Sequence, residues 1–163
     1  MATLNTIEQT AYPSYPAFKS GVETKRVFGS YTKTASLPAD DDYIILADKI
    51  PVHSCIHKIN MTHAAIAGMT DVDIVLLEPD GTLVETGLTT AGDVVYLAET
   101  LSFETARADA KVNTNLAKPI KDLVGLGGDA CPAYFTIAML VNTAGSTANI
   151  TISYDIEFSS PVC

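Results

Sequence analysis

The chain has 163 residues, 47% of them hydrophobic, and it carries 19 Asp and Glu against 10 Lys and Arg, a formal net charge of -9. This length suits one domain with a single sizeable core, and the apolar content argues against a chain that is disordered over most of its length. The negative charge repels phosphate backbones, so direct nucleic-acid binding is not expected. An acidic surface fits either a locally basic partner or simple solubility at high concentration.

The sequence lacks the patterns of secretion and membrane insertion. The N-terminus has no basic segment followed by an apolar one, and no apolar run approaches the roughly 18 residues that span a bilayer. The cysteines Cys55, Cys131 and Cys163 are widely and irregularly spaced, unlike a disulfide framework. We therefore expect a protein that folds in a reducing cytoplasm, keeps free thiols and does not bind membranes.

Residues 1–22 predict an extended N-terminal arm. Tyr12-Pro13 and Tyr15-Pro16, followed by Phe18, disfavour helix because each proline restricts its predecessor and removes a backbone donor. The aromatic side chains need burial, either on the chain's own domain or on a neighbouring subunit, and both alternatives stay open. We expect Tyr12, Tyr15 and Phe18 to be interface anchors, and residues 23–163 to form a single domain.

Strand patterns follow the arm in close succession. Residues 25–35, 43–47, 55–61 and 71–77 are rich in β-branched and aromatic residues, and 43–47 is apolar on both faces. The segment Glu78-Pro79-Asp80-Gly81-Thr82 predicts a tight turn, after which residues 83–86 return antiparallel to 75–77. Residues 93–112 mix strand formers with helix formers, and we expect an irregular excursion there.

The C-terminal part predicts one short helix and two long strands. Pro119 at a first helical position and Gly125 as a stop favour one or two helical turns near 119–124. Residues 149–158 alternate between apolar and polar side chains without a fault, as a half-buried strand does, and with 133–141 they predict a final hairpin. The expected fold class is all-β: an antiparallel, jelly-roll-like β-sandwich with an extended N-terminal arm and one short helix.

Histidine and cysteine alternate at one place in the chain. His53, Cys55 and His57 would share one face of a strand, His63 lies nearby, and imidazole and thiolate are good zinc ligands. Successive same-face residues, however, lie about 6–7 Å apart and do not converge on one ion unaided. His53, Cys55 and His57 are therefore only weak candidates for a metal site.

Other candidate chemistry has a simpler explanation. Ile59 and Met61 continue the face of the histidines, which favours a core. Asp40-Asp41-Asp42 lacks the alternating ligands of a calcium loop, and neither a Gly-x-Ser-x-Gly elbow nor a phosphate-loop pattern is present. We therefore expect no catalytic site, no metal and no cofactor.

Three segments resemble, in layout, the capsid decoration or cement proteins of tailed bacteriophages that are built on β-sandwich folds. They are LADKIPVH at 46–53, TDVDIVLL at 70–77 followed by EPDGT at 78–82, and LAKPIKDLVGL at 116–126, which leads to the closing strands. Together they cover roughly residues 46–158.

The resemblance implies a non-enzymatic virion protein on the capsid surface. Such a protein binds the major capsid protein of the same virion on the outside of an icosahedral head, as a trimer or dimer, and stabilises the shell. The family has no fixed catalytic or ligand residues to carry over. A phage tail or fibre component and a carbohydrate-binding β-sandwich remain alternatives, although the chain has no Trp for a sugar-binding platform.

Overall fold

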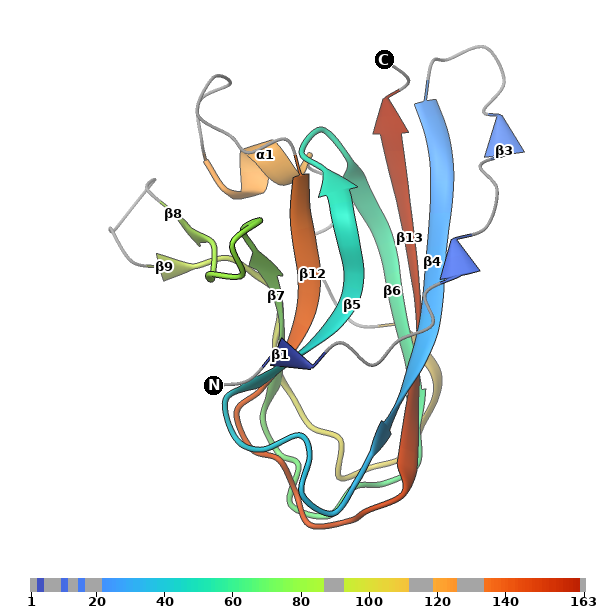
Figure 1. Cartoon of the computed structure of the whole chain (residues 1–163). Helices are drawn as coiled ribbons and strands as arrows, with labels where there is room; N and C mark the ends of the chain where they lie inside the picture. Colours follow the sequence, from blue (N-terminus) through green and yellow to red (C-terminus); the bar gives the residue numbers. More distant parts are fainter. Residues whose placement is uncertain are drawn as a thin grey trace.

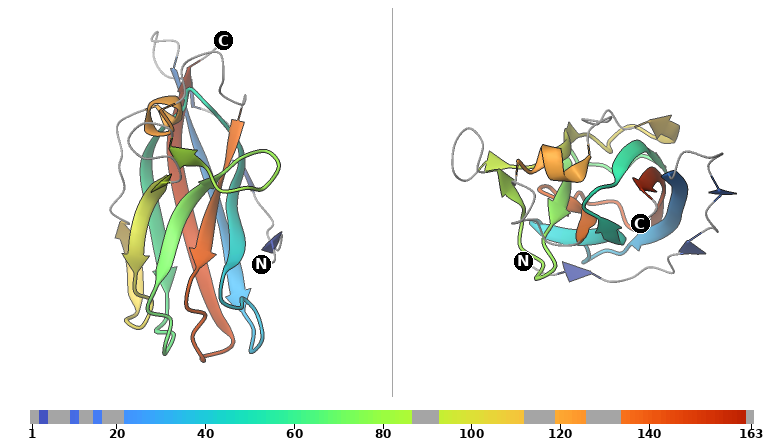
Figure 2. Two further views of the ribbon diagram at one scale, coloured as in Figure 1. Left: turned by 90° about the vertical axis from the view of Figure 1, so that its left-hand side faces the viewer. Right: turned by 90° about the horizontal axis from the view of Figure 1, so that it is seen from above.

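Two β-sheets pack face to face, with one short helix at one end of the sandwich (Figures 1 and 2). The computed structural model describes residues 3–4, 10–11, 15–16, 22–86, 93–111, 119–125 and 134–161. This architecture confirms the predicted all-β sandwich. None of the helices in these ranges has the length and apolar character to cross a membrane.

The first sheet, sheet A, has the order β1-β5-β12-β7-β10, and all its pairs except the parallel pair β1–β5 are antiparallel. Its strands are β1 (Thr3–Leu4), β5 (Asp42–Pro51), β12 (Tyr134–Val141), β7 (Val72–Leu77) and β10 (Tyr96–Leu101). A separate ribbon pairs β8 (Glu85–Thr86) with β9 (Asp93–Val94).

The second sheet, sheet B, has the order β11-β6-β13-β4-β2, with β3 also paired to β4, and it is antiparallel throughout. Its strands are β11 (Arg107–Lys111), β6 (Cys55–His63), β13 (Ile150–Pro161), β4 (Val22–Lys33), β2 (Thr10–Ala11) and β3 (Tyr15–Pro16).

The core lies between the inner faces of the two sheets. On β13 the predicted alternation is confirmed, because Ile152, Tyr154, Ile156 and Phe158 are buried while Thr151 is exposed. Burial of each such side chain contributes about 1.5–3 kcal/mol of transfer free energy. β7 is buried at every position, Asp73 included, as expected for a strand that is covered on both faces. A second apolar cluster on the outer face of sheet A explains this, and its buried members are Tyr43, Val75, Leu77, Ala138 and Leu140.

The predicted final hairpin of 133–141 and 149–158 is wrong. β12 lies between β5 and β7 in sheet A, whereas β13 lies between β4 and β6 in sheet B, so residues 142–149 cross from one sheet to the other. Both strands are central in their sheets, and each needs two neighbours for its backbone groups. The apolar pattern of two consecutive strands is the same in a hairpin and in such a crossing.

The turn at 78–82 forms as predicted, but the returning strand is shorter. Gly81 has φ +87°, and the Glu78 N–H donates to the Thr82 carbonyl at 2.8 Å. Leu83 bridges Leu77, and the Val84 N–H donates to the Leu76 carbonyl at 3.0 Å. Beyond Val84 the chain leaves β7 and pairs with β9, so the return predicted over 83–86 ends at residue 84.

The irregular excursion predicted for 93–112 is also wrong, because this segment forms β9 and then an edge strand of each large sheet. β10 pairs with β7 and β11 with β6, each with register shifts. Several residues between 98 and 110 have high helix propensity, but backbone pairing along a free sheet edge outweighs this preference. The short helix is confirmed as α1 (Ile120–Leu123), with Pro119 at the N-cap and with Ile120 and Val124 buried.

Three short strands of the N-terminal segment pair with edges of the chain's own sheets. β1 runs beside β5 in sheet A, and β2 and β3 run beside β4 in sheet B (Figure 1). The backbone of this segment thus meets both sheets on the same side of the sandwich. The division into an arm at 1–22 and a domain at 23–163 stays a prediction.

Four loops gather at the end of the sandwich opposite α1 (Figure 1), and we call this region the arch end: residues 34–41, 64–71, 102–106 and 142–149. Hydrogen bonds join these loops to one another. The Ser146 N–H donates to the Ala67 carbonyl at 2.8 Å, the Phe103 N–H donates to the Met69 carbonyl at 2.8 Å, and the Ala144 N–H donates to Asp40 Oδ1 at 2.8 Å. The arch end is therefore a fixed assembly of loops.

Candidate functional site

The outer face of sheet B is a polar surface that spans three strands. Rows of side chains run across it, because Ser153 on β13 is in register with both Ser30 on β4 and Thr62 on β6. All three are exposed. In the neighbouring row, the hydroxyls of Thr32 and Thr151 lie 3.1 Å apart and form a hydrogen bond. The polar residues of β13 alternate outward while its apolar residues enter the core, so the face follows directly from the strand pattern.

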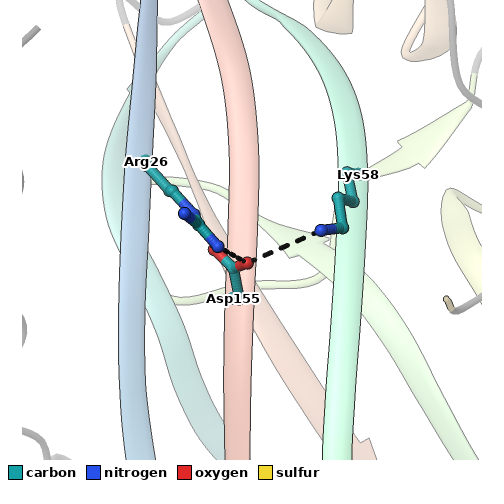
Figure 3. Close-up of polar contacts among 3 residues, drawn as sticks. All are labelled: Arg26, Lys58 and Asp155. Carbon is teal, nitrogen blue, oxygen red and sulfur yellow. Dashed lines mark hydrogen bonds and ion pairs between the residues drawn. The ribbon is translucent and has the colours of Figure 1, made fainter. Parts of the chain in front are cut away.

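Charged side chains form a network at the centre of this face (Figure 3). Arg26 Nε donates to Asp155 Oδ1 at 2.7 Å, its Nη2 donates to Oδ2, and Lys58 Nζ lies 3.8 Å from the same Oδ2. The hydrogen bonds from Arg26 lower the pKa of Asp155 below its usual value, and the charges of Arg26 and Lys58 act in the same direction. Glu157 is in register with both cations, so two cations and two carboxylates share this part of the face.

A histidine–serine contact lies on the same face. Nε2 of His57 is 2.7 Å from Oγ of Ser159, the contact that a serine nucleophile makes with its base. His57 is exposed, and within the described ranges no carboxylate hydrogen-bonds to its ring to orient it. We interpret the pair as a cross-strand polar contact, since catalysis also requires a positioned base and donors for the developing charge.

The three weak metal candidates do not converge. His53 is exposed in the turn after β5, Cys55 is half-buried at the start of β6 with a free thiol, and His57 lies on the outer face. A register shift in the pairing of β6 with β13 falls at His57, so Ile59 and His63 point into the core and do not continue the face of His57. In the part of the chain that the structure describes, no three His, Cys, Asp or Glu side chains are grouped to hold a metal ion.

The predicted arm anchors are only partly placed. Tyr15 is the first residue of β3 and its backbone pairs with Thr24 on β4. The side chain of Tyr15, and all of Tyr12 and Phe18, lie outside the described residues. Their role as interface anchors stays a prediction.

His63 has a role that the sequence analysis missed. It is 4% exposed, and its ring stacks on Phe103 with 4.1 Å between ring centroids and 15° between the planes. Its Nδ1 lies 2.9 Å from the Ala64 carbonyl, whereas its Nε2 is buried with no hydrogen-bond partner among the described residues. Burial lowers the pKa of His63, the hydrogen bond to Ala64 opposes this, and the charge of Arg107 lowers it further. Side chains two positions apart on a strand share a face, so alternation counted from the buried Ile59 predicts that His63 also points into the core.

The charged network was also missed, for a different reason. The alternation of 149–158 places Asp155 outside, but its partner Arg26 is 129 positions away in the sequence. Only the pairing of β13 with β4 and β6 brings Arg26 and Lys58 to its two sides. No local pattern carries that information.

The chain is therefore an all-β sandwich with a polar, internally paired outer face on one sheet. No family model and no curated protein matches it. Among solved structures it resembles a chain described as "Capsid of Ralstonia phage GP4", with 15% sequence identity and a TM-score of 0.47, over 88% of this chain and 87% of that chain. At this sequence identity and TM-score, the similarity to a phage capsid chain does not indicate a function for this chain.

Proposed function

We propose that the chain is a non-enzymatic virion structural protein, which binds the outer surface of an icosahedral phage head as a decoration or cement protein. In this proposal its partner is the major capsid protein of the same virion, and it acts as a homo-oligomer, a trimer or a dimer. The layout resemblance of residues 46–158 motivates the proposal, and features of the fold support it.

The supporting observation is the pairing of the N-terminal segment with both sheets. A strand edge exposes backbone donors and acceptors, which invite pairing with other chains. β1 covers part of the β5 edge, and β2 and β3 cover part of the β4 edge. A protein needed in many copies on one shell must reach high concentration without pairing edge to edge, and covered edges serve this need.

The charge distribution adds a second line of support. The net charge of -9 keeps copies of the chain apart in solution and suits a locally basic partner. On the outer face of sheet B, Arg26 and Lys58 are balanced by Asp155 and Glu157. These four side chains carry no net charge between them, so contact with a basic shell surface would use acidic residues elsewhere on the chain.

The test is co-sedimentation of the purified full chain with mature, expanded phage heads and with unexpanded precursor shells, at low and at high salt. We expect saturable binding to expanded heads at a fixed ratio to coat subunits, weakened by salt because exposed charges are screened. No binding to either shell would overturn the proposal and favour a tail component or a ligand-binding sandwich. Asp155→Asn is the matched control, since it alters charge on the balanced face and should leave shell binding unchanged.

A further inference from the structure

We propose that His63 is an acid-sensitive lock at the arch end of the sandwich. Its neutral imidazole closes the junction between β6, the loop around Phe103 and β11, and its protonation loosens that junction. The inference concerns the fold itself and does not depend on the proposed virion role.

The lock is built from a buried ring stacked on another buried ring. His63 is 4% exposed and Phe103 is 1% exposed, and their planes are 15° from parallel. A neutral imidazole packs against an aromatic ring as an apolar group does. A charged imidazolium in the same place would lose its hydration, which is unfavourable when nothing compensates it.

The hydrogen bonding of His63 leaves one ring nitrogen buried without a partner. Because Nδ1 lies 2.9 Å from the Ala64 carbonyl, Nδ1 carries the proton and donates, which leaves Nε2 as a bare acceptor. Nε2 is buried and has no partner within the described ranges. Protonation would place a new N–H donor there with no acceptor to receive it, so the protonated ring is stabilised only if the junction opens to water.

The charges around His63 act against the protonated form. Arg107 on β11 is in register with His63, and its positive charge repels an imidazolium. On β13, Ser153 pairs with Thr62 on the outer face, and the neighbouring residue that points inward, as His63 does, is the apolar Ile152. Glu104, next to Phe103, is exposed and accepts a hydrogen bond from the Gly68 N–H at 3.2 Å.

Loss of the packing between His63 and Phe103 would also weaken the hydrogen bonds that Phe103 makes with a neighbouring loop. The Ile66 N–H donates to the Phe103 carbonyl at 2.9 Å, and the Phe103 N–H donates to the Met69 carbonyl at 2.8 Å. Phe103 thus joins the loop between β6 and β7 to the loop between β10 and β11. If its ring loses its partner, these two hydrogen bonds lose their support and the edge strand β11 is freed.

The direction of the pH dependence follows from linkage. The pKa of His63 in the folded chain lies below its ordinary value of 6.5, so the unfolded chain binds a proton more readily. The stabilisation is complete above pH 6.5 and is lost as the pH falls through the lowered folded-state pKa. Between the two values the ratio of folded to unfolded chains falls up to tenfold for each pH unit.

The first experiment compares urea unfolding of the wild-type chain and His63→Phe from about pH 7.5 to about pH 5, a range in which histidine titrates. His63→Phe keeps an aromatic ring against Phe103 but cannot be protonated. We expect the pH dependence of the wild type to exceed that of His63→Phe in this range. His53→Gln is the matched control, since His53 is exposed in the turn after β5 and the variant should keep the wild-type dependence. Equal pH dependence in wild type and His63→Phe would overturn the inference.

A second measurement needs no variant. NMR titration of the three histidines in the wild-type chain should give His63 a pKa below 6.5, and protonation should reduce the hydrogen-exchange protection of the Ile66 and Phe103 amides. A His63 pKa at or above 6.5, or unchanged protection after protonation, would contradict the lock even if His63→Phe failed to fold.

Discussion

Replacing Gly145 with alanine tests whether the arch end is a fixed assembly. Gly145 has φ +65°, and a Cβ at this position would lie 2.8 Å from the Ala67 carbonyl oxygen, 2.8 Å from the Met69 nitrogen and 2.9 Å from the Met69 Cβ. Two of these atoms are backbone, so they cannot move aside as a flexible side chain does. Gly81 is the matched control, because it has φ +87° and a Cβ there would meet nothing within 4 Å.

Gly145→Ala and Gly81→Ala should change the free energy of unfolding by the same contributions, except for the steric contacts that only Gly145→Ala makes. Alanine in the left-handed region costs about 1–2 kcal/mol at either position, and the gain from restricting the unfolded chain is the same for both. At position 145 the contacts add a strain of about 1–3 kcal/mol, typical of overpacking. We expect Gly145→Ala to be less stable than Gly81→Ala by about that amount, and each kcal/mol corresponds to about 2–4 °C in Tm for a chain of this size.

The assay is urea unfolding of the two variants and the wild type, with thermal unfolding as a second probe. An unchanged m value would show that the native state remains compact in each variant. If the two variants differ by less than about 0.5 kcal/mol, the usual size of a neutral surface change, then the loops at 64–71 and 142–149 give way easily. In that case the fixed arch end that we describe is incorrect.

Three further predictions concern the sheets and the N-terminal segment. Asp155→Asn should remove a stabilisation of about 0–1 kcal/mol, as for exposed ion pairs. Because the pKa of Asp155 is lowered in the folded chain, this stabilisation is complete above the ordinary pKa of 3.8 and is lost as the pH falls through the lowered folded-state pKa. Unfolding of the wild type and the variant at a series of acidic pH values checks this. Ile156→Ala, at a fully buried position on β13, should destabilise by about 2–5 kcal/mol, and a loss below 1 kcal/mol in urea unfolding would contradict the central place of β13. Deletion of residues 1–20 should leave the sandwich folded, as circular dichroism would show, but weaken co-sedimentation with phage heads. A second variant, with Tyr12, Tyr15 and Phe18 changed to serine, removes the aromatic side chains and keeps the backbone. Unchanged binding to phage heads by both variants would refute the role of the arm.

The sequence by itself determined the elements whose signals are local. The alternation of residues 150–158 specifies both a strand and its buried face, because side chains along a strand point to opposite sides. The Pro-Asp-Gly turn at 79–81 and the helical turn after Pro119 are likewise encoded by residues that restrict their own backbone. These elements, and with them the all-β class, could be predicted without any knowledge of the neighbours.

The tertiary structure alone decided which strands pair and which side chains meet. β12 and β13 are consecutive but lie in opposite sheets, and residues 96–101 and 107–111 became strands because β7 and β6 offered free edges. The register shift at His57 turned His63 into the core, and the pairing of β13 with β4 and β6 assembled Arg26, Asp155 and Lys58. Strand pairing joins residues that are far apart in the sequence, so the local pattern that specifies each strand says nothing about its partner.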